Sequence, residues 1–145
     1  MRVLLQRVTS AEVRVSGRVV GAIDSGLLAF VGMERGDDGA TVERMTGRIA
    51  GYRMFADEQG RMNRSVCDIG GSVLLVSQFT LAADTGKGLR PGFSRAAEPQ
   101  EARRLCDALA AGLRDSGLPV AEGKFGADMQ VSLVNDGPVT FFINL

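Results

Sequence analysis

The first third of the chain consists of short runs in which apolar and polar residues alternate, a pattern typical of β-strands. The runs cover Arg2–Val8, Ala11–Ser16, Arg18–Ile23 and Leu27–Met33. Short stretches containing serine, aspartate and glycine separate the last three runs, as expected at tight turns. The pattern predicts an antiparallel meander of consecutive strands.

Two later segments have helical periodicity. Between about Gly39 and Tyr52, apolar residues recur every three or four positions, and two aspartates precede the segment, which suits a helix start. A second helix is predicted to begin at Pro99 and to end near Gly117, a residue suited to a C-terminal cap. Its predicted buried stripe consists of Ala102, Leu105, Cys106, Leu109 and Leu113.

Between the helices, the run Ser72–Leu81 is apolar on both faces as far as Val76, which predicts a central strand covered on both sides. No linker-like stretch or internal repeat divides the chain, so residues 1–145 are expected to form one domain. The predicted fold class is α+β: an antiparallel, curved, barrel-like sheet with two helices packed on it.

Two further strand-like runs, Met129–Val134 and Val139–Leu145, are separated only by Asn-Asp-Gly-Pro. Asp-Gly is a strong hairpin signal, but a two-residue turn closes with the N–H of the next residue, and Pro138 has none. Two interpretations remain open. Either Pro138 opens an edge strand after a wider loop, or Gly137-Pro138 is a rigid main-chain element that contacts a ligand.

The chain has 17 basic and 17 acidic residues, so its formal net charge is zero. This balance disfavours a generic electrostatic binder of nucleic acid, and no DNA partner is expected, although a few local cations suffice for a small RNA contact. Met1–Arg7 is too short for a signal peptide, and no apolar stretch approaches the length of a membrane span. A cytoplasmic protein without a membrane partner is expected.

No histidine is present, which removes the commonest general base and metal ligand. Cys67 and Cys106 lie far apart and match no metal-binding spacing. We therefore expect no metal, no cofactor and no thiol enzyme, and we interpret Cys106 as a buried structural thiol.

The segment Ser77–Leu81 places polar residues on both faces where the apolar strand ends. One interpretation is a strand that frays into a loop. The other is a catalytic segment whose main-chain N–H groups stabilise an oxyanion while its polar side chains position a substrate.

Four motifs together resemble D-aminoacyl-tRNA deacylase, the chirality-proofreading esterase of translation. They are Gln6–Val8, Ser77–Asp84, Gly88–Phe93 and Ala127–Thr140, and their order and the chain length also agree. The resemblance implies a homodimer that hydrolyses the ester between a D-amino acid and the terminal adenosine of tRNA. Glycyl-tRNA is expected to be cleaved as well, because glycine has no side chain to be rejected.

The resemblance also implies roles for individual residues. Ser77, Gln78, Phe79 and Thr80 form the catalytic segment, with a covalent role for Thr80 as the rival mechanism. Gly137-Pro138, with a cis peptide bond and braced by Arg7, enters the active site of the other subunit and excludes L-amino acids. Leu81, Phe125 and Met129 are candidate substrate contacts, although the last two also suit the core, and Lys87, Arg90 and Arg95 are candidate tRNA contacts or merely solvated loop residues.

A second function class stays open at this point. A small glycine-rich barrel without catalytic side chains also suits a noncatalytic module that binds a nucleotide, a flavin or an RNA end. One departure from the family pattern is Gly92, where serine is expected in many relatives.

Overall fold

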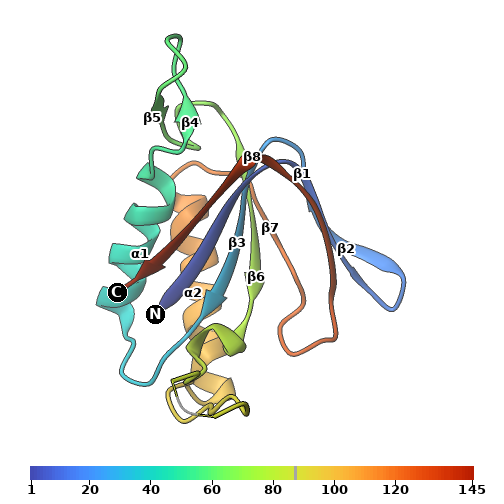
Figure 1. Ribbon diagram of the computed structural model, residues 1–145, viewed down its shortest axis with the longest axis vertical. Coiled ribbons are helices and arrows are strands. Elements are labelled where there is room, and N and C mark those ends of the chain that lie inside the picture. Colours follow the sequence, from blue (N-terminus) through green and yellow to red (C-terminus); the bar gives the residue numbers. More distant parts are fainter. Residues whose placement is uncertain (87) are drawn as a thin grey trace.

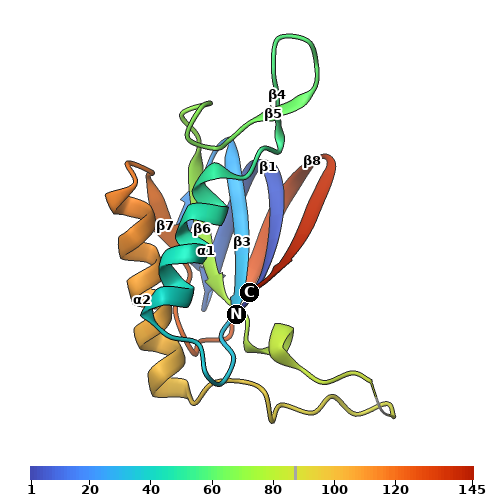
Figure 2. The ribbon, with the colours of Figure 1, turned by 90° about the vertical axis from the view of Figure 1, so that its left-hand side faces the viewer.

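The computed structural model describes residues 1–86 and 88–145 and has two helices packed against one face of a curved sheet (Figures 1 and 2). The sheet has six strands: β1 (Arg2–Val15), β2 (Arg18–Ile23), β3 (Gly26–Gly32), β6 (Ser72–Ser77), β7 (Val120–Glu122) and β8 (Gln130–Asn144). The predicted α+β class, with two helices on a curved sheet, is confirmed.

The sheet is organised around β1, which pairs antiparallel with three strands. Its first half pairs with β3, its second half pairs with β2, and both halves pair with β8 on the other edge. In contrast, β3 with β6 and β6 with β7 pair parallel. The curved sheet that we expected to be antiparallel is therefore mixed, because each helix carries the chain back across the sheet before the next strand, as parallel pairing requires.

The two helices have the predicted extents, α1 over Gly39–Gly51 and α2 over Pro99–Asp115. The Asp38 carboxylate caps α1 by accepting hydrogen bonds from the Thr41 N–H at 2.8 Å and hydroxyl at 3.0 Å, which lower the pKa of Asp38. Among the described residues, neither helix is long and apolar enough to cross a membrane.

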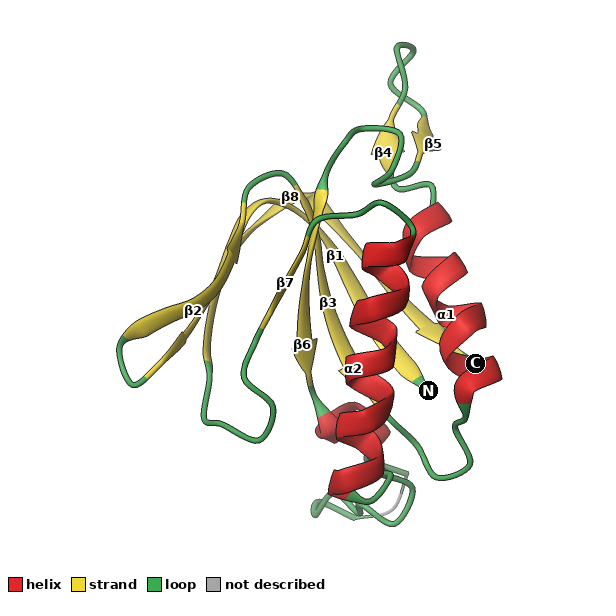
Figure 3. Cartoon of the chain, turned by 180° about the vertical axis from the view of Figure 1, so that it is seen from behind, coloured by secondary structure: helices red, strands yellow, loops and turns green. Residues whose placement is uncertain are grey.

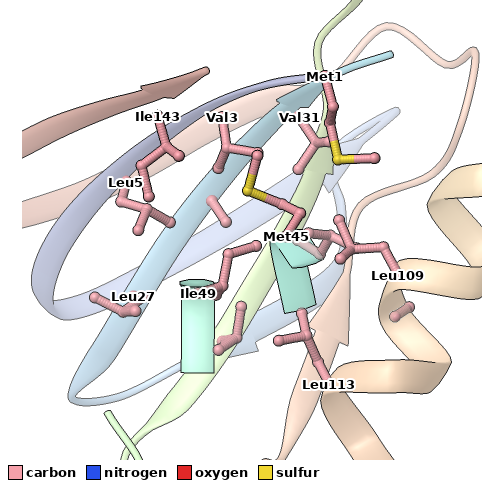
Figure 4. Close-up of a cluster of buried hydrophobic side chains, with 14 of the residues drawn as sticks. Met1, Val3, Leu5, Leu27, Val31, Met45, Ile49, Leu109, Leu113 and Ile143 are labelled. Atoms are coloured by element: carbon pink, nitrogen blue, oxygen red, sulfur yellow. The ribbon is translucent and has the colours of Figure 1, made fainter. Parts of the chain in front are cut away.

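The sheet has a separate hydrophobic core on each face. Figure 4 shows Met45 and Ile49 of α1 and Leu109 and Leu113 of α2 directed at Val3, Leu5, Leu27 and Val31 of the sheet. The second core, on the concave side, contains Val8, Ala11, Val13, Ile23, Leu28, Leu74 and Val76. Alternate residues of β6 belong to different cores, which confirms the prediction of a central strand buried on both faces.

A short two-stranded hairpin, β4 (Phe55–Ala56) with β5 (Met62–Arg64), projects beyond the end of the sheet (Figures 1 and 3). It follows α1 directly. The carbonyl of Met54 at its base accepts a hydrogen bond from Arg7 of β1, so the hairpin is joined to the sheet at this point.

The two C-terminal runs form one long strand, β8, and Asn-Asp-Gly-Pro does not reverse the chain. Gln6 lies opposite Thr140 and Ser10 lies opposite Val134, so β8 has two more residues than β1 over this interval. The additional residues form a bulge, and the missing N–H of Pro138 breaks no turn.

Candidate active site

A cavity of about 500 Å³ opens where β3 and β6 end. Its walls come from these strand ends, from the short 3₁₀ helix η1 (Phe79–Ala82), from the start of α2 and from the loop that leads into β8. Five of the predicted site residues line it: Ser77, Gln78, Phe79, Phe125 and Met129. The cavity thus brings together two motifs that lie about fifty residues apart in the sequence.

The predicted catalytic segment, which begins at Ser77, is held by the sheet at its start. Ser77 still pairs with Val31, and the Gln78 N–H donates to the Val31 carbonyl at 2.7 Å. The chain then turns into η1, and the backbone N–H groups of Phe79 and Thr80 donate to no other described residue. Within the part of the chain that the structure describes, these two main-chain donors have no acceptor, and Phe79 lines the cavity.

The Thr80 side chain is exposed, and its hydroxyl oxygen accepts a hydrogen bond from the Gln78 side-chain amide. An amide nitrogen is a donor and cannot remove the hydroxyl proton. Among the described residues, no side chain suited to act as a base bonds the Thr80 hydroxyl.

The position of η1 depends on a close contact with β3. A Cβ atom at Gly32 would lie 2.9 Å from the Leu81 Cβ and 3.0 Å from the Gln78 carbonyl oxygen, so only glycine fits there without displacement. From β1, the Arg2 guanidinium donates to the Leu81 carbonyl at 3.0 Å and forms an ion pair with Glu34 at 3.0 Å. Leu81, a predicted substrate contact, lies within η1 against Gly32 and is not among the described residues that line the cavity.

Asp128 and Cys106 are among the cavity residues that were not predicted as part of the site. Asp128 belongs to the motif Ala127–Thr140 and is the one charged residue among the described residues of the lining. Burial, followed by the nearby Asp107 and Glu122 carboxylates, raises the pKa of the Cys106 thiol to about 12. The thiol is therefore neutral near pH 7, in keeping with the structural role that we predicted.

The Gly-Pro element, residues 136–138, protrudes from β8 between its two paired halves. The Gly137-Pro138 peptide bond is cis, and Gly137 has a φ of 132°, a value that side-chain-bearing residues rarely adopt. A Cβ atom at Gly137 would lie 2.7 Å from a Val139 methyl group and 3.1 Å from the Arg7 guanidinium.

Two side chains hold the Gly-Pro element from opposite ends. The Arg7 Nε–H donates to the Asp136 carbonyl at 3.0 Å, and its Nη1–H donates to the Met54 carbonyl at 2.8 Å. The Asn135 side-chain Oδ1 accepts from the Val139 N–H at 3.0 Å, while the Asn135 side-chain Nδ2 donates to the Thr140 hydroxyl at 2.9 Å. These bonds span the base of the bulge and fix where it protrudes.

The Gly-Pro element and the cavity occupy different parts of one subunit. None of Arg7, Gly137 and Pro138 is among the described residues that line the cavity. Both parts are bonded to β1. Arg2 bonds η1, and Arg7, which follows five residues later on the same strand, bonds the Gly-Pro element.

The candidate tRNA contacts Arg90 and Arg95 are both exposed on the segment between η1 and α2. Neither side chain forms an ion pair with another described residue. Lys87 lies outside the described residues.

Comparison with known proteins identifies the family. A family model described as D-Tyr-tRNA(Tyr) deacylase matches residues 4–144. The chain belongs to this family. A D-aminoacyl-tRNA deacylase of Alcanivorax borkumensis is 61% identical over 145 residues, which cover 100% of both chains. A protein of the same name from Methylococcus capsulatus is 59% identical, covering 99% of this chain and 94% of the relative.

Solved structures agree with the fold of this deacylase-family chain. A protein named "c-Myc DNA Unwinding Element Binding Protein" superposes with a TM-score of 0.95 at 37% identity, covering 100% of this chain and 99% of that one. A structure described as a probable eukaryotic D-amino acid tRNA deacylase has a TM-score of 0.83 at 15% identity, covering 99% and 98%. The second similarity shows the fold alone.

The contact between Gly32 and η1 gives a testable prediction. We expect Gly32→Ala to lower the free energy of unfolding by about 1–3 kcal/mol through overpacking, and to lower deacylation by about 100-fold because η1 is displaced. Gly47→Ala is the matched control, since a Cβ atom there meets nothing within 4 Å and helix propensity favours alanine by roughly 0.5–1 kcal/mol. Denaturant unfolding and deacylation assays measure both effects, and unchanged activity in Gly32→Ala would contradict this role for the contact.

Proposed function

We propose that this protein hydrolyses the ester bond between a D-amino acid and the terminal adenosine of tRNA, releasing free D-amino acid and tRNA as a proofreading step in translation. The observation that carries this proposal is the pair of free main-chain N–H groups of Phe79 and Thr80 beside an apolar cavity. Membership of the deacylase family supports the same reaction.

The proposed chemical step needs no strong base from the protein. Water attacks the ester carbonyl carbon, the N–H groups of Phe79 and Thr80 stabilise the oxyanion, and the bond to the ribose oxygen breaks as that oxygen takes up a proton. An aminoacyl ester is already activated, and the neighbouring ribose 2′-hydroxyl assists the attack. The absence of histidine from the sequence is compatible with this substrate-assisted mechanism.

The cavity supplies surfaces for the terminal adenosine and the amino acid. Phe125 and Met129 form part of its wall, and the Met129 sulfur accepts a hydrogen bond from the Lys124 N–H at 3.3 Å, which orients that side chain. Ser77 and Gln78 are half-buried at the rim and position the adenosine or the substrate. The apolar walls exclude water other than the attacking molecule.

We further propose that the active enzyme is a homodimer. Phe30, Leu4 and Phe142 are direct cross-strand neighbours on β3, β1 and β8, and they form an apolar row on the face of the sheet that the helices leave uncovered. Phe142 is 54% exposed. A second copy related by a two-fold axis would cover this row with its own identical row.

Such a dimer would combine the two separated parts of the site. The apolar row crosses β1 at Leu4. This position lies between Arg2, which supports η1, and Arg7, which supports the Gly-Pro element. A two-fold axis through the row brings the Gly-Pro element of one subunit toward the cavity of its partner. Each active site would then contain a cavity from one chain and a Gly-Pro element from the other.

Chiral selection follows from the rigidity of the Gly-Pro element. If main-chain groups fix the amino group and the ester carbonyl, the hydrogen and the side chain on the substrate Cα exchange places between D and L forms. The L side chain then strikes the element, while D side chains of any size point away. A backbone clash can supply several factors of ten in discrimination between the D- and L-esters, and each factor corresponds to about 1.4 kcal/mol. The loss of one methylene contact supplies only one or two such factors.

The remaining assignments follow from the substrate. Arg90 and Arg95, exposed on the segment between η1 and α2, contact tRNA phosphates, and the same role is proposed for Lys87. The equal numbers of acidic and basic residues limit the protein to such local contacts. A proofreading enzyme of translation is expected in the cytoplasm, where charged tRNA is used.

The direct test compares release of tyrosine from D-tyrosyl-tRNA and L-tyrosyl-tRNA, with glycyl-tRNA as the third substrate. We expect the D-ester to be cleaved at least about 100-fold faster than the L-ester, and glycyl-tRNA to be cleaved because it lacks the side chain that the element rejects. Absence of glycyl-tRNA cleavage at high enzyme concentration would contradict the steric model. If the protein binds these tRNAs but cleaves none of the esters, the protein is a noncatalytic RNA-end-binding module and not an enzyme.

The Gly-Pro element is tested by variants in the same assay. Gly137→Ala and Arg7→Ala are expected to reduce the ratio of D to L cleavage or to abolish activity, because both displace the element. Gly60→Ala is the matched control, since Gly60 has a φ of 76° in the β4–β5 hairpin and open space around it. An unchanged D to L ratio in Arg7→Ala would show that Arg7 does not brace the element.

The dimer is tested by sedimentation. We expect a two-chain species for the wild type, and monomers with much reduced activity for Phe142→Glu, because a charge in the apolar row opposes its burial. Val19→Glu is the control, since Val19 is also exposed, at 46%, but lies on β2. A fully active monomer would eliminate the cross-subunit site while leaving the reaction itself intact.

Substitution of Thr80 distinguishes the substrate-assisted mechanism from a covalent mechanism in which Thr80 is the nucleophile. Loss of a covalent nucleophile lowers the rate by a factor on the order of 10⁶ in a well-studied protease, whereas loss of one hydrogen bond costs about 1 kcal/mol. We expect Thr80→Ala to retain activity within about tenfold of the wild type, consistent with that smaller cost. Single-turnover assays of this variant and of Thr80→Ser measure the difference, and a large loss in the alanine variant that serine restores would favour the covalent mechanism.

A further inference from the structure

Two aromatic rings form an exposed surface outside the mouth of the cavity. The Phe79 and Phe93 ring centroids are 5.1 Å apart with an interplanar angle of 54°. The two residues remain 59% and 40% exposed, respectively. Phe79 also lines the cavity, so this surface is continuous with the candidate active site.

The surrounding backbone holds Phe93 in place. On one side, Gly92 exchanges two backbone hydrogen bonds with Asp84, at 2.7 and 3.0 Å. On the other side, the Ala96 N–H donates to the Phe93 carbonyl at 3.1 Å, and the Ala97 N–H donates to the Met33 carbonyl at 3.0 Å. The ring is thus placed against Phe79 by a segment that is tied to itself and to the end of β3.

An apolar surface of this kind needs a partner, and its position favours a nucleotide. The surface adjoins the proposed adenosine site, and the arginines at positions 90 and 95 flank Phe93 in the sequence and are exposed. Aromatic rings next to cations are the usual means of binding single-stranded nucleic acid, with bases stacked on the rings and phosphates near the cations.

We propose that the Phe79–Phe93 surface binds the base of the nucleotide that precedes the terminal adenosine, by stacking. The inference rests on the proposed function, because it takes the terminal adenosine to occupy the cavity. The nucleotide before it leaves through the mouth, where the Phe79 ring forms part of the rim. Phe93 is then a binding residue for tRNA that takes no part in the chemistry of the ester.

The test is a double-mutant cycle between the ring and the base. D-tyrosyl-tRNA with an intact penultimate nucleotide is compared with the same tRNA carrying an abasic residue there, using wild type and Phe93→Ala. Base–aromatic stacking is worth about 1–3 kcal/mol, so each single change should lower kcat/KM by about 5-fold to 100-fold, mainly through KM. The two changes together should lower it little further, because they remove the same contact.

Three further variants complete the experiment: Phe93→Trp, Phe93→Leu and Leu89→Ala. Phe93→Trp should keep the coupling with the base, because tryptophan also offers a ring face. Leu89→Ala should behave as wild type with both tRNAs, since Leu89 is fully exposed in the same segment. The stacking proposal would be overturned if the effects of Phe93→Ala and of the abasic residue on kcat/KM were additive, or if Phe93→Leu had the kcat/KM of the wild type. Either result would leave the proposed deacylation intact. No cleavage of the intact tRNA by wild type would overturn the proposed function and this inference together.

Discussion

The pairing of β8 with β1 on both sides of the Gly-Pro element is the constraint on which the rest of the site depends. Both halves of β8 pair with β1, so the two additional residues of β8 between Val134 and Thr140 have no partner residues on that strand. They must protrude at one place. Arg7 donates to the Asp136 carbonyl and the Asn135 side chain accepts from the Val139 N–H, so the bulge is held at both ends. Ordinary strand pairing plus two side chains thus hold the Gly-Pro element, for which we propose the selective role.

β1 also positions the proposed catalytic segment. Arg2 bonds the carbonyl of Leu81, and Gly32, its cross-strand partner on β3, leaves room for η1 to approach. The cavity and the Gly-Pro element are therefore fixed to the same strand, five residues apart, and their spacing is set by the backbone. An enzyme that works mainly by position needs such a scaffold, because small displacements of main-chain donors reduce oxyanion stabilisation.

Local periodicity was sufficient to predict much of the fold. The helices α1 and α2, strand β2 and the double burial of β6 follow from patterns within single segments. The parallel pairing of β6 was not predictable in this way, since it depends on where a helix returns the chain. The continuity of β8 was missed for a related reason: Asp-Gly signals a turn, and only the partner strand β1 shows that the chain does not reverse. At the site, motifs indicated Ser77–Phe79, Phe125 and Met129. Asp128 lies in the same motif as Met129 but was not singled out, whereas Cys106 joins the site only through folding.

The proposed mechanism has a consequence for how such a site can change. If oxyanion stabilisation and chiral exclusion both come from main-chain groups, substitution of the local side chains alters them only by moving the backbone. The residues that matter most are then those that hold backbone in place: Gly32, Arg2, Arg7 and Asn135. Side chains that touch the substrate directly, such as Phe93 in the stacking proposal, would instead tune affinity for the tRNA end. Selection against L-amino acids and affinity for tRNA would therefore rest on separate residues and vary independently.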